Sequence, residues 1–159
     1  MEHRNCKKNR HGLSRWLVFV SLVSTGVAMN AAAAESDADV ARRVAESWVA
    51  IVDGAEYARS WETLAVELRR KVSREDWATD MRTLRAPLGA LQERSLIGAR
   101  FVRDLPDAPP GEYMVVQYSS RYEHFPAVLE TIVPMRGDDG VWRVAGYFIR
   151  GDIQTAPPQ

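Results

Sequence analysis

Glu130 is the residue of this chain whose position most invites a chemical explanation. It stands in the middle of the apolar run Ala127 to Val133. A carboxylate in such a strand needs a partner or a cavity to offset its desolvation, and one that faces a cavity can serve as a general base. We favour the more common alternative, in which Glu130 faces solvent or pairs across strands with an arginine. The arginines in question are Arg121, Arg143 and Arg150.

Three aromatic residues are candidates to share a site with Glu130. If Glu130 were a base, the hydroxyls of Tyr118 and Tyr147 would be suited to donate to a developing oxyanion. Trp48 belongs to the apolar stripe of the first expected helix. Trp48, Tyr118, Glu130 and Tyr147 are therefore the candidate ligand-binding residues. The competing interpretation is a filled core with tyrosine hydroxyls at its margin, and we favour it.

Other catalytic and metal chemistry lacks the residues it needs. His124 is the one histidine outside the N-terminal segment, and the sole cysteine, Cys6, lies within that segment. Zinc sites built from His and Cys cannot be assembled from a single copy. A serine triad would also need a Gly-x-Ser-x-Gly turn, which is absent, as are calcium loops and the glycine-rich loops that hold phosphates. We therefore expect no metal and no cofactor.

Residues 1–34 have the pattern of a cleavable secretory signal. Five basic residues before Trp16 precede an apolar run to Ala28, and small residues end at Ala34. The strongly apolar part is shorter than the ~20 residues that a bilayer span requires. We expect cleavage after Ala34 and a periplasmic or secreted protein with no stable membrane anchor; an uncleaved anchor is the alternative.

The charge that remains after cleavage bounds the partners. Removing the basic signal leaves a mildly acidic chain. Nucleic acids and anionic lipids are bound by clustered positive charge, so neither is expected as a partner. Residues 35–150 should form one domain, because they are too few for two, and residues 151–159 a flexible tail, because they contain little apolar material.

Helical periodicity dominates the first half of this domain. Ser36-Asp-Ala-Asp39 and Ser73-Arg-Glu-Asp76 both have the spacing of a helix N-terminal capping box. Apolar residues at helical spacing predict a first helix up to Val52, a second over Tyr57 to Val72 that bends near Ser60, and a third that Pro87 ends.

Strand signals replace the helical ones from about residue 91. Alternation and β-branched or aromatic residues predict four strands, with short turns between them that favour antiparallel pairing. The expected strands are Leu91 to Val102, Glu112 to Tyr122, Ala127 to Met135 and Val141 to Arg150. The predicted fold class is α+β: three N-terminal helices packed on one face of a curved four-stranded antiparallel sheet.

Several short patches carry a family resemblance. They include Ala45-Glu-Ser-Trp48, Asp53-Gly-Ala-Glu-Tyr57, Arg85-Ala-Pro-Leu-Gly89 and Trp142-Arg-Val-Ala-Gly-Tyr147. With these patches the chain resembles, over about Val40 to Arg150, a bacterial exported family known as domain of unknown function 4019. More loosely, the order of elements is similar to the cystatin-like or nuclear-transport-factor-two-like cone, which implies a cystatin-like or partial cone fold.

Two classes of function remain open. The first is a non-enzymatic module that binds an envelope component, a partner protein or a small apolar ligand through its sheet face or the cleft between helices and sheet. The second is a small cofactor-free lyase or isomerase of the cone type with Glu130 as general base, which would need a pocket around that residue. We favour the first, because catalytic constellations are missing; a homodimer is a further alternative.

Overall fold

The computed structural model describes residues 36–151 of the 159-residue chain. The predicted signal at residues 1–34 lies outside the described residues, as does the predicted tail except for Gly151. Between residues 36 and 151, no helix combines the length and hydrophobicity needed to cross a membrane.

The two predicted capping boxes begin the two longest helices. Helix α1 (Asp37–Asp53) follows Ser36, whose hydroxyl accepts from the backbone N–H of Asp39. Helix α4 (Arg74–Arg85) follows Ser73, which caps the N–H of Asp76 in the same way. Both caps satisfy donors that the first turn of a helix leaves unpaired.

The predicted helix from Tyr57 to Val72 is two short helices instead of one. These are α2 (Tyr57–Glu62) and α3 (Val66–Arg69). Between them Leu64 forms a parallel bridge with Val144, and the N–H of Ala65 donates to the carbonyl of Val144 at 2.8 Å. The chain leaves the helical conformation here because its backbone pairs with the edge of the sheet. The 3-10 helix η1 (Ala86–Leu88), which contains Pro87, follows α4.

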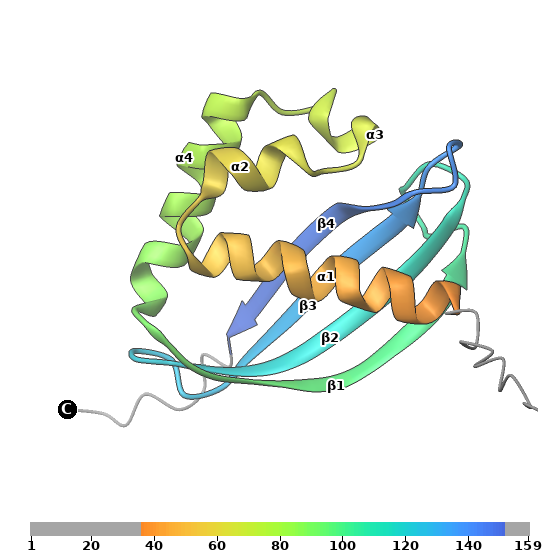
Figure 1. Cartoon of the computed structure of the whole chain (residues 1–159). Helices are drawn as coiled ribbons and strands as arrows, with labels where there is room; N and C mark the ends of the chain where they lie inside the picture. The colour runs from red at the N-terminus through yellow and green to blue at the C-terminus, as the bar shows by residue number, and fades with distance from the viewer. Residues whose placement is uncertain (1–35, 152–159) are drawn as a thin grey trace, which may run out of the picture. The chain divides into compact units, whose positions relative to one another are not determined.

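The second half of the domain is a meander of four antiparallel strands. They are β1 (Leu91–Arg103), β2 (Glu112–Tyr122), β3 (Val128–Arg136) and β4 (Trp142–Gly151), in the order β1-β2-β3-β4. The predicted α+β class with a four-stranded antiparallel sheet is therefore confirmed. Figure 1 shows α1 crossing one face of this sheet, which we call the helix-facing side; the opposite side is the outer face.

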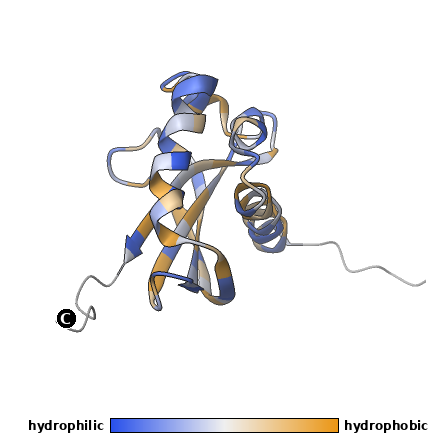
Figure 2. Cartoon of the chain, turned by 90° about the vertical axis from the view of Figure 1, so that its left-hand side faces the viewer, coloured by the Kyte–Doolittle hydropathy of each residue, from blue (hydrophilic) through white to orange (hydrophobic). Residues whose placement is uncertain are grey.

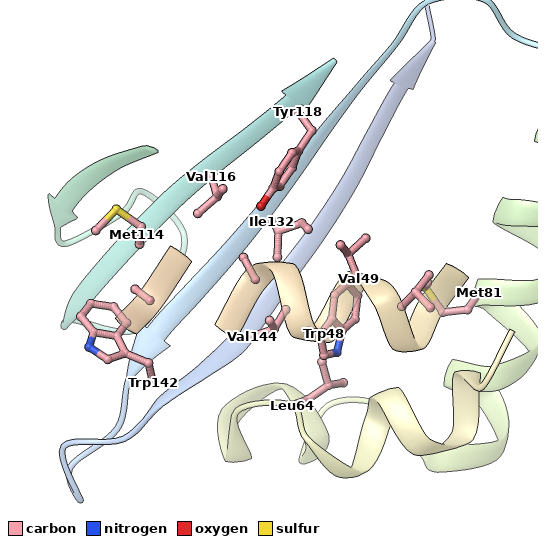
Figure 3. Close-up of a cluster of buried hydrophobic side chains, with 13 residues drawn as sticks. Trp48, Val49, Leu64, Met81, Met114, Val116, Tyr118, Ile132, Trp142 and Val144 are labelled. Carbon is pink, nitrogen blue, oxygen red and sulfur yellow. The ribbon is translucent and has the colours of Figure 1, made fainter. Parts of the chain in front are cut away.

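The main core lies between α1 and the helix-facing side. Trp48 and Val49 of α1 pack with side chains that alternate along the strands, such as Val116, Ile132 and Val144. Figure 3 shows these side chains pointing toward one another. In Figure 2 α1 is seen nearly end-on beside the sheet and carries hydrophobic and hydrophilic residues around its turns, as an amphipathic helix at a core boundary should.

Candidate functional site

Glu130 lies at the centre of a group of polar side chains buried between the helices and the sheet. It is completely inaccessible to solvent. The residues that surround it come from α1, α4, β1, β2 and β4, and with Glu130 of β3 we call them the buried polar cluster. Its members are Asp53, Arg85, Arg94, Ser120, Tyr122, Glu130 and Tyr147.

Both oxygens of Glu130 accept several hydrogen bonds. Oε1 accepts from the hydroxyls of Ser120 and Tyr122, the latter at 2.9 Å, and from Nε of Arg94 at 3.0 Å. Oε2 accepts from the Tyr147 hydroxyl at 2.6 Å, from Nη2 of Arg94 at 3.2 Å and from Nη1 of Arg85 at 3.3 Å. Glu130 therefore has the partners that a buried carboxylate requires.

Asp53 completes a ring of four charged residues. Nη2 of Arg85 donates to its Oδ1 at 2.7 Å, and Arg94 contacts both of its oxygens. Each arginine thus bridges the same two carboxylates, Asp53 and Glu130. The guanidinium groups are well shielded, with side-chain exposures of 8% for Arg85 and 12% for Arg94. Two positive and two negative groups balance, which limits the cost of burying them.

The buried environment shifts the pKa values of the cluster. Burial, followed by the charge of Glu130, raises the pKa of Tyr122 to about 12 against the opposing effect of the arginines. Burial and then Glu130 also raise the pKa of Tyr147. For Arg94, burial would lower the pKa, but hydrogen bonding to Asp53 and the charge of Glu130 more than offset it, and the pKa is raised. The tyrosines therefore stay neutral and the arginines charged.

The ends of two helices place the outer members of this cluster. Asp53 is the last residue of α1, where the helix dipole disfavours an acid, and the two arginines supply the compensating charge. Arg85 is the last residue of α4, where a cation is favourable. The cluster therefore fastens the C-terminal ends of both helices to the sheet.

The structure brings the four candidate ligand-binding residues together. The Trp48 and Tyr147 rings meet edge to face with centroids 5.2 Å apart, and Tyr147 bonds Glu130. Tyr118 faces Glu130 directly across β2 and β3. Trp48, Tyr118 and Glu130 are buried, and Tyr147 is half-buried. Their role in binding a ligand stays a prediction.

The partners expected for Glu130 are wrong. Glu130 neither faces solvent nor pairs with Arg121, Arg143 or Arg150. Arg121 bonds Glu93 and Arg143 bonds Asp139. Arg150 lies opposite Leu129. Since successive residues of a strand point to opposite faces, Leu129 and Arg150 occupy the outer face while Glu130 occupies the helix-facing side.

Five members of the site were not predicted from the sequence: Asp53, Arg85, Arg94, Ser120 and Tyr122. Two signals were present. Asp53 is an acid at the end of a helix, which calls for a cation nearby. Arg94 lies two residues before Leu96 and so shares the helix-facing side with it, as its pairing opposite Ser120 shows.

This arrangement limits the chemistry that Glu130 can perform. Each of its oxygens already accepts from three donors, so neither is free to take a proton from a substrate. No group of three or more His, Cys, Asp or Glu side chains within residues 36–151 is placed to hold a metal ion. The geometry suits a structural role, in which the buried polar cluster holds the C-terminal ends of α1 and α4 against the sheet.

A second site lies on the outer face, away from the cluster. It is a hollow of about 530 Å³, which we call the outer groove. Val115, Val133 and Gly146 form its floor, Leu68 and Lys71 line the side of α3, and the β1–β2 loop lines the other with Leu105 and Pro109.

Hydrogen bonds hold the loop wall of the outer groove in place. The Tyr113 hydroxyl donates to the carbonyl of Pro109 at 2.5 Å. The backbone N–H and the carboxylate of Asp104 both bond Gly111, each at 3.0 Å. Tyr113, Val133 and Met135, which line the groove, form a small buried apolar cluster. The groove is therefore formed before any ligand arrives, a common property of ligand sites.

The chain matches one protein family in comparisons with known proteins. A family model described as "Protein of unknown function (DUF4019)" matches residues 44–147. That range includes every member of the buried polar cluster and most of the outer groove. No curated protein matches the chain.

Proposed function

The chain belongs to the DUF4019 family, and we propose that it is a non-enzymatic accessory module that binds an apolar group in its outer groove. The apolar group belongs to a small ligand or to an envelope partner. The observation that carries the proposal is the outer groove itself, an apolar hollow of about 530 Å³ with fixed walls. Such hollows are the default sites for apolar ligands.

We also propose that the protein is exported and that its helices and sheet form a cystatin-like or partial cone fold. The N-terminal pattern of basic, apolar and small residues supports export to the periplasm or beyond. The crossing of α1 over one face of the sheet supports a cystatin-like or partial cone arrangement of helices and sheet.

The surroundings of Glu130 argue against the alternative of a lyase or isomerase. A general base needs a free lone pair within reach of the substrate, whereas the oxygens of Glu130 are engaged by two arginines and three hydroxyls. The hollows that open on the outer face and beside α1 are lined by other residues. The buried polar cluster therefore supports stability better than turnover.

Binding of N-phenyl-1-naphthylamine, an uncharged apolar fluorophore, tests the proposal. We expect saturable binding, with nuclear magnetic resonance shifts of the backbone amides of Val115, Val133 and Gly146. Ala145→Phe, which fills the groove, should weaken binding by roughly tenfold, the effect of about 1.4 kcal/mol. Ala127→Phe is the matched control, because Ala127 is exposed and lies outside the groove.

Two outcomes would contradict the proposal. One is equal binding by both variants with shifts elsewhere in the domain. The other is catalytic turnover of a small molecule by the purified protein that Tyr147→Phe abolishes while the circular dichroism spectrum stays unchanged. That second result would favour the enzyme.

A further inference from the structure

The two edges of the sheet differ in how they are covered. The β4 edge is paired at Val144, where Leu64 and Ala65 run alongside it. The β1 edge has no such cover: over its 13 residues β1 pairs with β2 alone among the described residues. An uncovered edge presents unpaired backbone N–H and C=O groups, which form a template for another strand.

Side chains along β1 leave this template accessible. Ser95, Gly98 and Ala99 are small and exposed, and a Cβ added at Gly98 would meet nothing within 4 Å. Beside them are large exposed apolar residues: Leu96 at 46%, Ile97 at 59% and Phe101 at 46%. Three of the seven exposed large apolar residues found within residues 36–151 thus lie on this one strand. Natural edge strands usually avoid such exposure.

The charge of β1 indicates what kind of strand would pair with it. The strand contains Glu93, Arg94, Arg100 and Arg103. Glu93 is already paired with Arg121, and Arg94 belongs to the buried polar cluster. Arg103 is 74% exposed despite its contact with Glu112. Apart from the small polar Ser95, the side chains that remain available at the edge are apolar or positively charged, which favours an apolar and acidic partner.

A second copy of the chain fits this edge poorly. Antiparallel self-pairing would place one positive strand against another. Glu93 and Arg100 share the outer face, where they lie opposite Arg121 and Val115, so one register could bring Glu93 to Arg100 of the other copy. Glu93 is already paired with Arg121 of its own sheet, and two β1 strands together keep an excess of positive charge.

We propose that the free edge of β1 binds an extended segment of a partner polypeptide by strand addition, and that this segment alternates apolar with acidic residues. The backbone of the segment supplies hydrogen bonds to the unpaired groups of β1. Successive residues of the segment point to opposite faces, so its apolar side chains cover Ile97 on the outer face while its acids meet Arg103 on the helix-facing side. Of the β1 side chains only Arg100 also lines the outer groove; Leu96, Ile97 and Arg103 lie outside it.

A synthetic ten-residue peptide of alternating valine and aspartate is the probe. We expect it to bind and to protect the amides of β1 from hydrogen exchange. Two peptide controls separate the contributions: lysine in place of aspartate, and methylated backbone nitrogens in place of N–H. Each should weaken binding by at least about tenfold, since charge and main-chain bonding are both needed.

A matched pair of protein variants completes the test. Ile97→Asp should abolish binding of the valine-aspartate peptide, because it replaces the apolar contact with a charge that repels the aspartates, and Leu84→Asp, at a similarly exposed position on α4, should not. Both positions are exposed, so folding is retained, and circular dichroism checks this. Absence of binding by the valine-aspartate peptide at millimolar concentration would overturn the proposal. So would equal binding of all three peptides, or concentration-dependent protection of β1 without peptide, which would identify a second copy as the occupant.

Discussion

Tyr118 and Glu130 face each other directly across β2 and β3, yet only Glu130 is hydrogen bonded. Glu130 accepts from Arg85, Arg94, Ser120, Tyr122 and Tyr147. The buried hydroxyl of Tyr118 has no partner among the described residues. Two neighbouring polar groups of the same interior therefore contribute to stability in opposite ways.

Replacing Tyr118 should differ from replacing Tyr147. Tyr118→Phe removes a hydroxyl that is buried without a hydrogen bond, so we expect the free energy of unfolding to stay level or to rise by up to about 1 kcal/mol. Tyr147→Phe removes one of the donors to the buried Glu130 and one of the acceptors of Arg85, so it should cost about 1–3 kcal/mol. Urea denaturation of the two variants measures both values, and equal losses would show that the Tyr118 hydroxyl is satisfied in solution.

Loss of the Glu130 charge should strongly destabilise the domain. Glu130→Gln leaves Arg85 and Arg94 buried with Asp53 as their remaining counter-charge, and breaking such a pair from one side costs roughly 3–5 kcal/mol. Glu93→Gln is the matched control, because its pair with Arg121 is exposed and should contribute less than about 1 kcal/mol. Thermal unfolding of the two variants should separate them clearly; similar melting temperatures would contradict the role given to the cluster.

Alkaline pH should weaken the fold through its buried tyrosines. Burial raises the pKa of Tyr118 and of Tyr122 to about 12, against about 10 in an unfolded chain. Between those pH values the folded state holds more protons than the unfolded state, so the free energy of unfolding falls as pH rises. It should be fully retained below about pH 10. Urea midpoints across this range, together with the ultraviolet absorbance of tyrosinate, test the effect, and Tyr118→Phe should make the decline shallower.

Ser60 should matter more than its size suggests. Its buried hydroxyl donates to the carbonyl of Tyr57 and accepts from Nε1 of Trp77 at 3.0 Å. Ser60→Ala leaves that indole without its acceptor, which should cost roughly 1–3 kcal/mol. Thr83→Ala, which removes an exposed hydroxyl from α4, is the control and should change stability by less than about 0.5 kcal/mol. A null effect at Ser60 would mean that water replaces the hydroxyl.

Local signals in the sequence were enough to predict most of the secondary structure. The capping serines Ser36 and Ser73 begin their helices as expected, since a cap is satisfied within three residues of the chain. The strands were predictable from another local signal, the alternation of apolar and polar residues along the chain. The break at Leu64 was not predictable, because its cause is a bridge to Val144, eighty residues further along the sequence.

The site was predictable in its centre and not in its surroundings. Glu130 stood out because an acid in an apolar strand needs an explanation. The arginine partners expected for it lie on the neighbouring strands, whereas its actual partners Arg85 and Arg94 come from the end of a helix and from β1. Parity along the strands excludes Arg150, but only the tertiary packing of α4 on the sheet brings Arg85 to the carboxylate.

The connectivity of the buried polar cluster also bears on how the domain folds. Each strand pairs only with its neighbour in sequence, so the sheet can grow hairpin by hairpin at little loop-closure cost. The ring of Asp53, Arg85, Arg94 and Glu130 instead closes only when α1, α4, β1 and β3 have all arrived. Interactions that form after the transition state govern unfolding rather than folding. Closure of this ring after the transition state would slow unfolding and so set the lifetime of the native domain. The folding rate would then depend on formation of the sheet.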